Sequence, residues 1–92
     1  MTTNAEWVRV DPARITDALL KEGVEKVNSA ESEAILDFSN VLRIDGTATR
    51  ALEELAGLAE GRSVKVVLRG INVEIYRVLK LLKLTRRFSF VT

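Results

Sequence analysis

The sequence predicts an α/β domain built on a mainly parallel sheet. Two apolar runs, at residues 34–41 and 63–70, carry hydrophobic side chains at successive positions, as strands buried on both faces do. A helical pattern follows each run, and another precedes the first. Strands that alternate with helices are joined by right-handed crossovers, which makes the sheet mainly parallel.

The composition indicates a single folded domain over residues 1–92. Hydrophobic residues make up 47% of the chain, and a net charge of +1 gives no bulk field that would attract nucleic acid or an anionic membrane. The absence of cysteine and histidine excludes disulfides, thiolate or histidine metal sites and histidine-dependent nucleophiles. No signal peptide or membrane-spanning run is present, so we expect a cytoplasmic protein without metal or cofactor.

The first third of the chain contains one helix and one ambiguous turn. Residues 6–10 alternate apolar and charged side chains, which predicts a short strand. Asp11 and Pro12 either start a helix or form a turn that leaves a second short strand at residues 14–16. In both cases a helix continues to about Asn28. Its expected buried face consists of Ala18, Leu19, Val24 and Val27.

The middle of the chain predicts a capped helix after the first buried strand. Asp45 is expected to cap a helix over about 46–60, whose apolar positions recur at spacings of three and four. Gly61 is expected to end this helix in the left-handed conformation.

The last third predicts a second capped helix and an edge strand. Asn72 is expected to cap a helix over 73–83, and residues 86–91 are expected to form an edge strand. The inward residues of the helix are expected to be Ile75, Val78, Leu79 and Leu82. We expect partial exposure of Val73, Leu81 and Leu84, which form either a partner surface or part of a wide core-facing stripe.

Two carboxylates, Asp37 and Asp45, flank the end of the first buried strand. Such a pair can act as acid and base or hold a magnesium ion. Eight residues of strand would separate the two by about 26 Å, which argues against a shared site. We therefore expect Asp45 to cap its helix and Asp37 to accept hydrogen bonds from nearby amides.

Gly46 and Thr47 raise the question of phosphate binding. A glycine at a helix start lets backbone amides approach an anion, but no P-loop or dinucleotide motif is present. Thr47 is either an ordinary exposed residue of the first turn or a phosphorylation site, favoured by the helix dipole and opposed by Asp45. The scattered arginines come with too few aromatic residues to build a nucleic-acid stacking platform.

Four segments together resemble a known family. They read "AILDFSNVLRID", "GTATRALEELAGLAEG", "SVKVVLRG" and "NVEIYRVLKLLKLTRRFSF", and they span residues 34–90. In combination they resemble the STAS domain, the family of the bacterial anti-sigma-factor antagonists. The resemblance implies a STAS-like mixed β-sheet of four to five strands with helices packed mainly on one face. It also favours the turn at Asp11-Pro12 with a second strand after it.

The resemblance implies a function centred on the turn after the first buried strand. In antagonists, a partner kinase that is also the anti-sigma factor phosphorylates the serine after an aspartate, and this blocks binding. Asp45 matches the aspartate, Gly46 occupies the acceptor position, Thr47 follows it, and Ala48 replaces a glycine. The standard switch therefore has no hydroxyl here, and Thr47 could replace it only if the register of the turn shifted.

We therefore expect a non-enzymatic regulatory module that binds a protein, either an anti-sigma kinase or a transporter ATPase. The alternative is an accessory STAS subunit of an ABC-type phospholipid transporter, a role that Gly46 leaves untouched. A small-ligand sensor would need a pocket that the sequence does not mark. We expect no nucleic-acid partner and no membrane insertion, and a homodimer is possible. The expected contact surface consists of Asp45, Gly46, Thr47, Ala48, Thr49, Arg50 and Glu53.

Overall fold

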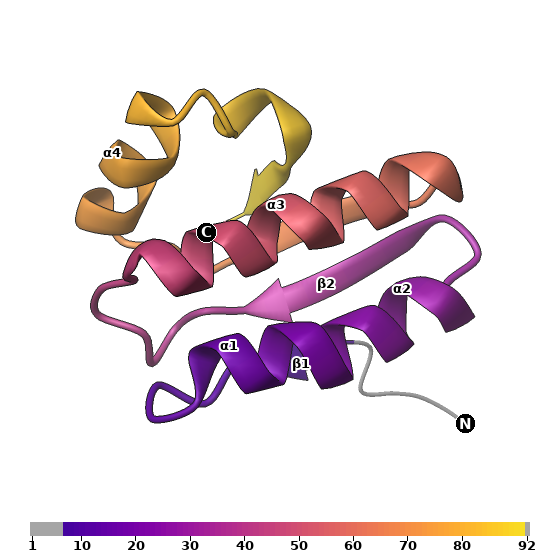
Figure 1. Cartoon of the computed structure of the whole chain (residues 1–92), viewed down its shortest axis with the longest axis horizontal. Coiled ribbons are helices and arrows are strands. Elements are labelled where there is room, and N and C mark those ends of the chain that lie inside the picture. Colours follow the sequence, from indigo (N-terminus) through magenta and orange to yellow (C-terminus); the bar gives the residue numbers. More distant parts are fainter. Residues whose placement is uncertain (1–6, 92) are drawn as a thin grey trace.

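A computed structural model describes residues 7–91 as a four-stranded sheet covered by a layer of helices (Figure 1). The strands are β1 (Trp7–Arg9), β2 (Glu33–Asp37), β3 (Lys65–Arg69) and β4 (Ser89–Val91). They lie side by side in the order of the sequence, and all three pairings are parallel. The α/β fold with four strands is confirmed. Within residues 7–91 the sheet is wholly parallel, without the antiparallel pairing that a mixed sheet would contain.

All helices lie on one face of this sheet, as the resemblance implied. Because each parallel strand adds next to the previous one through a right-handed crossover, successive helices fall on the same side. Figure 1 looks onto this helix layer, with β1 behind the first helix and β3 behind α3 (Gly46–Gly61). The core between the two layers is closed by the alternate strand residues Ala34, Leu36, Val66 and Leu68.

A helical stretch of three consecutive parts follows β1. It comprises α1 (Ile15–Asp17), the π-helical segment η1 (Ala18–Gly23) and α2 (Val24–Ser29). The turn at Asp11 is confirmed, because its carboxylate accepts a 2.9 Å hydrogen bond from the amide of Ala13. The second strand at residues 14–16 was wrong, since the amide of Ala18 already donates to the carbonyl of Arg14 and begins the helix.

The expected buried face of this stretch is largely present, and one glycine allows it to pack closely. Ala18, Leu19 and Val27 are buried, and Val24 is half-buried against the core. A Cβ added to Gly23 would lie 3.2 Å from a methyl group of Leu55 on α3. The glycine therefore lets the two helices approach, which offsets its low helix propensity.

Helix α3 ends one residue later than expected. Its last residue is Gly61, and Ser63 rather than Gly61 adopts the left-handed conformation, with φ 58°. The amide of Val64 donates to the carbonyl of Ala59 at 2.8 Å, the bond that closes a Schellman motif. Gly61 is thus the final helical residue, and the expectation that it forms the left-handed cap was wrong.

Helix α4 (Val73–Leu81) ends in the same way, which changes the expected burial of its last turn. Lys83 has φ 61°, and the amide of Leu84 donates to the carbonyl of Leu79 at 2.8 Å. The motif brings Leu84 back against Leu79, so Leu84 is buried although partial exposure was expected. Leu82 lies beyond the helix and is exposed, so its expected inward position was wrong.

The chain finishes with a short 3-10 turn, η2 (Thr85–Arg87), and the edge strand β4. Arg87 donates to both carboxylate oxygens of Glu60, at 2.9 and 3.0 Å, and so joins η2 to the last turn of α3. The predicted edge strand is confirmed over residues 89–91. Within residues 7–91, no helix is long and apolar enough to cross a membrane.

Candidate docking site

The predicted turn lies where the loop after β2 enters α3. Asp45 has extended backbone angles, and its Oδ1 accepts a 2.9 Å hydrogen bond from the amide of Ala48. A side-chain acceptor at this position satisfies one of the free amides of the first helical turn. The capping role expected for Asp45 is therefore confirmed.

The seven residues of the predicted contact surface divide into an exposed and a buried group. Ala48 and Thr49 face the interior, and Thr49, only 7% exposed, donates from Oγ1 to the carbonyl of Gly46 at 2.8 Å. These two buried side chains stabilise the turn and are not accessible to a partner. The exposed group consists of Asp45, Gly46, Thr47, Arg50 and Glu53.

A buried carboxylate fixes the start of the loop that leads to this turn. Asp37, the last residue of β2, is 6% exposed, and its Oδ1 accepts hydrogen bonds from the amide of Ser39 at 3.0 Å and from its hydroxyl at 2.5 Å. Burial alone would raise the pKa of Asp37. The two bonds from Ser39 and the charges of Arg69 and Arg9 outweigh it and hold the pKa of Asp37 below its ordinary value. The expected role as an acceptor for loop amides is confirmed.

A second side chain holds the middle of the loop. Asn72 caps α4 through Oδ1, which accepts from the amide of Ile75 at 2.8 Å. The same side chain donates from Nδ2 to the carbonyls of Leu42 at 2.9 Å and Val41 at 3.4 Å. The sequence predicted the cap, but it gave no sign of this bridge, because the partners lie about thirty residues apart.

Two large apolar side chains are exposed on the segments that this bridge joins. Leu42 is 75% exposed, and Val73, directly after Asn72, is 71% exposed. A single exposed apolar side chain of this size is common on protein surfaces. Here there are two, and they lie on segments that the side chain of Asn72 joins. Partial exposure was expected for Val73. Leu42 was missed, because in sequence it reads as the continuation of a buried strand.

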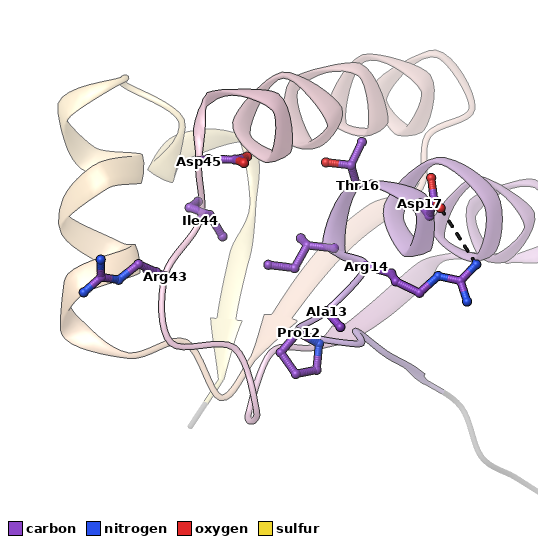
Figure 2. Close-up of a pocket in the computed structure, with 9 residues that line it drawn as sticks. Pro12, Ala13, Arg14, Thr16, Asp17, Arg43, Ile44 and Asp45 are labelled. Carbon is purple, nitrogen blue, oxygen red and sulfur yellow. Dashed lines mark ion pairs between the residues drawn. The ribbon is translucent and has the colours of Figure 1, made fainter.

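A shallow hollow of about 490 Å³ lies on the other side of the turn (Figure 2). Its walls come from the turn before α1 and from the end of the loop before α3. In Figure 2, Asp45 and Thr16 lie on opposite walls, Arg14 pairs with Asp17 and Arg43 points away from the hollow. The residues of the hollow are Pro12, Ala13, Arg14, Ile15, Thr16, Asp17, Arg43, Ile44 and Asp45.

The hollow was not predicted, because its two walls are distant in the sequence and neither carries a recognised motif. The sequence of residues 11–16 predicts either a helix start or a turn followed by a short strand. The signal for both is Asp11-Pro12, which does not indicate what this segment faces. Among residues 7–91 no group of three or more acidic side chains is arranged to hold a metal ion.

The start of α3 is exposed, and the Asp45 cap fixes its first turn. An exposed helix start at the carboxyl edge of a parallel sheet, rigidly supported from below, is a surface suited to recognition. The chain belongs to the STAS domain family, whose model matches residues 13–92. No curated protein and no solved structure matches the chain.

Proposed function

We propose that this protein is a cytoplasmic, non-enzymatic regulatory module that binds a kinase-like or ATPase partner protein through the start of α3. The family of anti-sigma-factor antagonists is the context for this role. The observation that carries the proposal is the exposed group Asp45, Gly46, Thr47, Arg50 and Glu53, which lies at the N-cap and over the first two turns of α3. Carboxylate, hydroxyl and guanidinium groups in this arrangement offer both donors and acceptors to a partner surface.

The proposed module lacks the standard phosphorylation switch. Gly46 stands where antagonists carry the acceptor serine, and a Cβ added to Gly46 would meet no atom within 4 Å. The turn has room for a side chain, so the missing hydroxyl follows from the residue type and not from crowding. Thr47 is exposed beside it and is the one hydroxyl of the exposed group. A phosphate there would lie near the positive end of the α3 dipole.

Gly46 also favours a second candidate function. An accessory STAS subunit of an ABC-type phospholipid transporter docks on the ATPase subunit and needs no phosphorylated residue. A glycine in the acceptor position is fully compatible with such permanent docking. The two candidates share the same surface on this chain and differ in the class of ATPase that it binds.

The test is affinity capture from the native host with the immobilised chain, followed by identification of the retained proteins. We compare the wild-type chain with Thr47→Glu and Arg50→Glu, and use Arg86→Glu as a matched control. Glutamate in the first turn of a helix is compatible with its dipole, so Thr47→Glu should fold normally. Arg86 is exposed in η2, next to the Arg87 side chain that binds the last turn of α3.

The expected result is one ATPase that is retained by the wild type and by Arg86→Glu, but lost with Thr47→Glu and Arg50→Glu. A histidine-kinase-like ATPase would support the sigma-regulatory role, and a transporter ATPase would support the accessory-subunit role. Retention that none of the variants alters would contradict docking at this turn. So would the absence of any retained protein.

A further inference from the structure

Within residues 7–91, no helix covers the face of the sheet opposite the helix layer, although its own side chains leave Val67 and Asp37 only 5% and 6% exposed. Helices pack on the alternate residues of β2 and β3 that belong to the core, so the residues between them point to the other side. Val67 agrees with this, because it is buried yet lies outside the core cluster. Arg69 also agrees, since its guanidinium lies 4.2 Å from the ring centre of Trp7 on β1. Wholly parallel sheets are nearly always covered on both faces, so an occupant is expected here.

The central two strands give this face three rows with a regular pattern. Glu33 lies beside Lys65, Ile35 beside Val67, and Asp37 beside Arg69. On β2 the two outer rows are therefore acidic, and on β3 they are basic. The middle row is apolar on both strands. The charge of the outer rows is therefore opposite on the two strands and the same at both ends of each strand.

We propose that this face pairs with the same face of a second copy, about a two-fold axis that runs along the strands between β2 and β3. Such an axis places β2 of one protomer over β3 of its partner and keeps the rows aligned. Glu33 then meets Lys65 of the second protomer, Ile35 meets Val67, and Asp37 meets Arg69. Glu33 and Lys65 are exposed, so each gains a second neighbour of opposite charge and these contacts dominate the pairing, whereas Asp37 and Val67 are already buried within one protomer.

The outer strands fit the same operation. Trp7 shares the middle row with Ile35, and Ser89 shares it with Val67 at the opposite edge. The axis places the largest side chain of the row over the smallest. Sheets that pack face to face keep their strands within about 30° of parallel, which agrees with an axis along the strands.

The other face-to-face arrangement is disfavoured by charge. A two-fold axis across the strands would place each strand over its own copy in the reverse direction. Glu33 would then meet Asp37, and Lys65 would meet Arg69, so both strands would oppose like charges. Like charges brought together at an interface disfavour that arrangement, so the pattern of this face selects a single orientation.

The small size of the face predicts a weak dimer. Four strands of at most five residues cover roughly 14 by 17 Å, well below the extent of a standard stable interface. We expect a reversible equilibrium with a dissociation constant on the order of 100 µM. This face lies opposite the helix layer, so the test of the dimer is independent of the test of docking at the start of α3.

Sedimentation velocity of the wild-type chain from about 10 µM to about 1 mM tests the proposal, with Glu33→Lys, Lys65→Glu and their equimolar mixture. Each single reversal opposes like charges twice in its own dimer, and should weaken dimerisation at least about tenfold. In the mixture the reversed charges are complementary again. Glu25→Lys, an exposed change on α2, is the matched control.

The expected result is a concentration-dependent dimer that both single variants lose, that Glu25→Lys retains and that the mixture restores as a heterodimer. Restoration by mixing separates a surface effect from a folding defect, because misfolded chains would not pair. A wild-type chain that stays monomeric throughout would overturn the proposal. Single variants that dimerise like the wild type would also overturn it, and so would a mixture that stays monomeric.

Discussion

Two of the strand-to-helix turns at the carboxyl edge of the sheet, those after β2 and β3, both end in a side chain that caps the next helix, but they differ in their surroundings. The turn from β2 to α3 takes eight residues, 38–45, and the turn from β3 to α4 takes three, 70–72. Both finish with a side chain that caps the helix, Asp45 in the longer turn and Asn72 in the shorter one. The shorter turn is half-buried and packed and hydrogen-bonded against the longer one, whereas the longer one ends exposed to solvent.

This difference indicates that the short turn stabilises the fold, whereas the long turn carries exposed residues that we expect a partner protein to contact. Gly70 and Asn72 of the short turn contact residues 39–42 of the long one, and so fix its path. The end of the long turn and the first residues of α3 can then present Gly46 and Thr47 to solvent beside Asp45, whose side chain caps the helix. Changes in the short turn should therefore reduce stability, and changes in the long turn should mainly reduce binding.

The largest effect is expected from Gly70→Ala. Gly70 has φ +73°, and an added Cβ would lie 2.4 Å from Oγ of Ser39 and 3.0 Å from its backbone. Backbone strain and overlap together should cost about 3 kcal/mol of unfolding free energy, measured by urea denaturation. Adding Ser39→Gly removes the side-chain overlap and should recover part of the loss. Wild-type stability of Gly70→Ala would show that the short turn is not crowded.

Asn72→Ala should have the next largest effect, because it removes both the cap and the bridge to Leu42. We expect a loss of about 2 kcal/mol by the same measurement. Asn72→Asp keeps an acceptor for the cap and removes the two donors, and should cost about half as much. If the aspartate variant is as stable as the wild type, the bridge does not contribute to the fold.

Asp37→Asn tests the anchor at the beginning of the long turn through its dependence on pH. The pKa of Asp37 is lowered in the folded state, so its stabilising effect is present above the ordinary value of 3.8 and disappears as the pH falls through the lowered value. The variant should be less stable than the wild type by about 1–2 kcal/mol at neutral pH. The difference should shrink towards about pH 2. A difference that is constant over this range would exclude the charge as its cause.

Asp45 should contribute less to stability, because its side chain makes one hydrogen bond, the cap, to the described residues 7–91. Asp45→Ala should cost about 1 kcal/mol, and Asp45→Asn should cost little, since asparagine caps equally well. The asparagine variant therefore removes the charge while the helix start stays intact. If Asp45→Asn destabilises as strongly as Asp45→Ala, the carboxylate does more for the fold than cap the helix.

Gly46→Ala should have the smallest effect and the opposite sign. No atom lies within 4 Å of an added Cβ, and alanine is the better helix former. Thermal unfolding should show a chain that is stabilised by up to about 0.5 kcal/mol. Together with Gly70→Ala, this variant is a direct comparison of the two turns, and destabilisation would contradict their proposed difference.

Local signals made the framework of this domain predictable from sequence. The caps at Asp45 and Asn72 are set by residues three positions away, and both were predicted with the helices that they begin. The helix ends were less predictable, because Ser63 and Lys83 adopt left-handed backbone angles, which serine and lysine rarely do. The burial of Leu84 follows from that turn, which interrupts the helical periodicity.

The candidate site was predictable only in part. Its central turn was located through the cap and the family resemblance, and the apolar periodicity of the helix placed Ala48 on the buried face. The burial of Thr49 depends on what packs beneath it, so this polar residue could not be separated from its exposed neighbours. The bridge from Asn72 to Leu42 and the hollow beside Asp45 join segments that are distant in sequence. Such features arise from tertiary packing, for which one sequence contains no local signal.

The most direct test of the account is the affinity of the captured ATPase for Arg50→Glu compared with Arg86→Glu, measured by isothermal titration calorimetry. Both variants reverse one exposed arginine, but Arg50 lies at the start of α3 and Arg86 beyond its end. The account predicts binding at least about tenfold weaker for Arg50→Glu and within about twofold of wild type for Arg86→Glu. Equal affinities for the two variants would contradict docking at the start of α3.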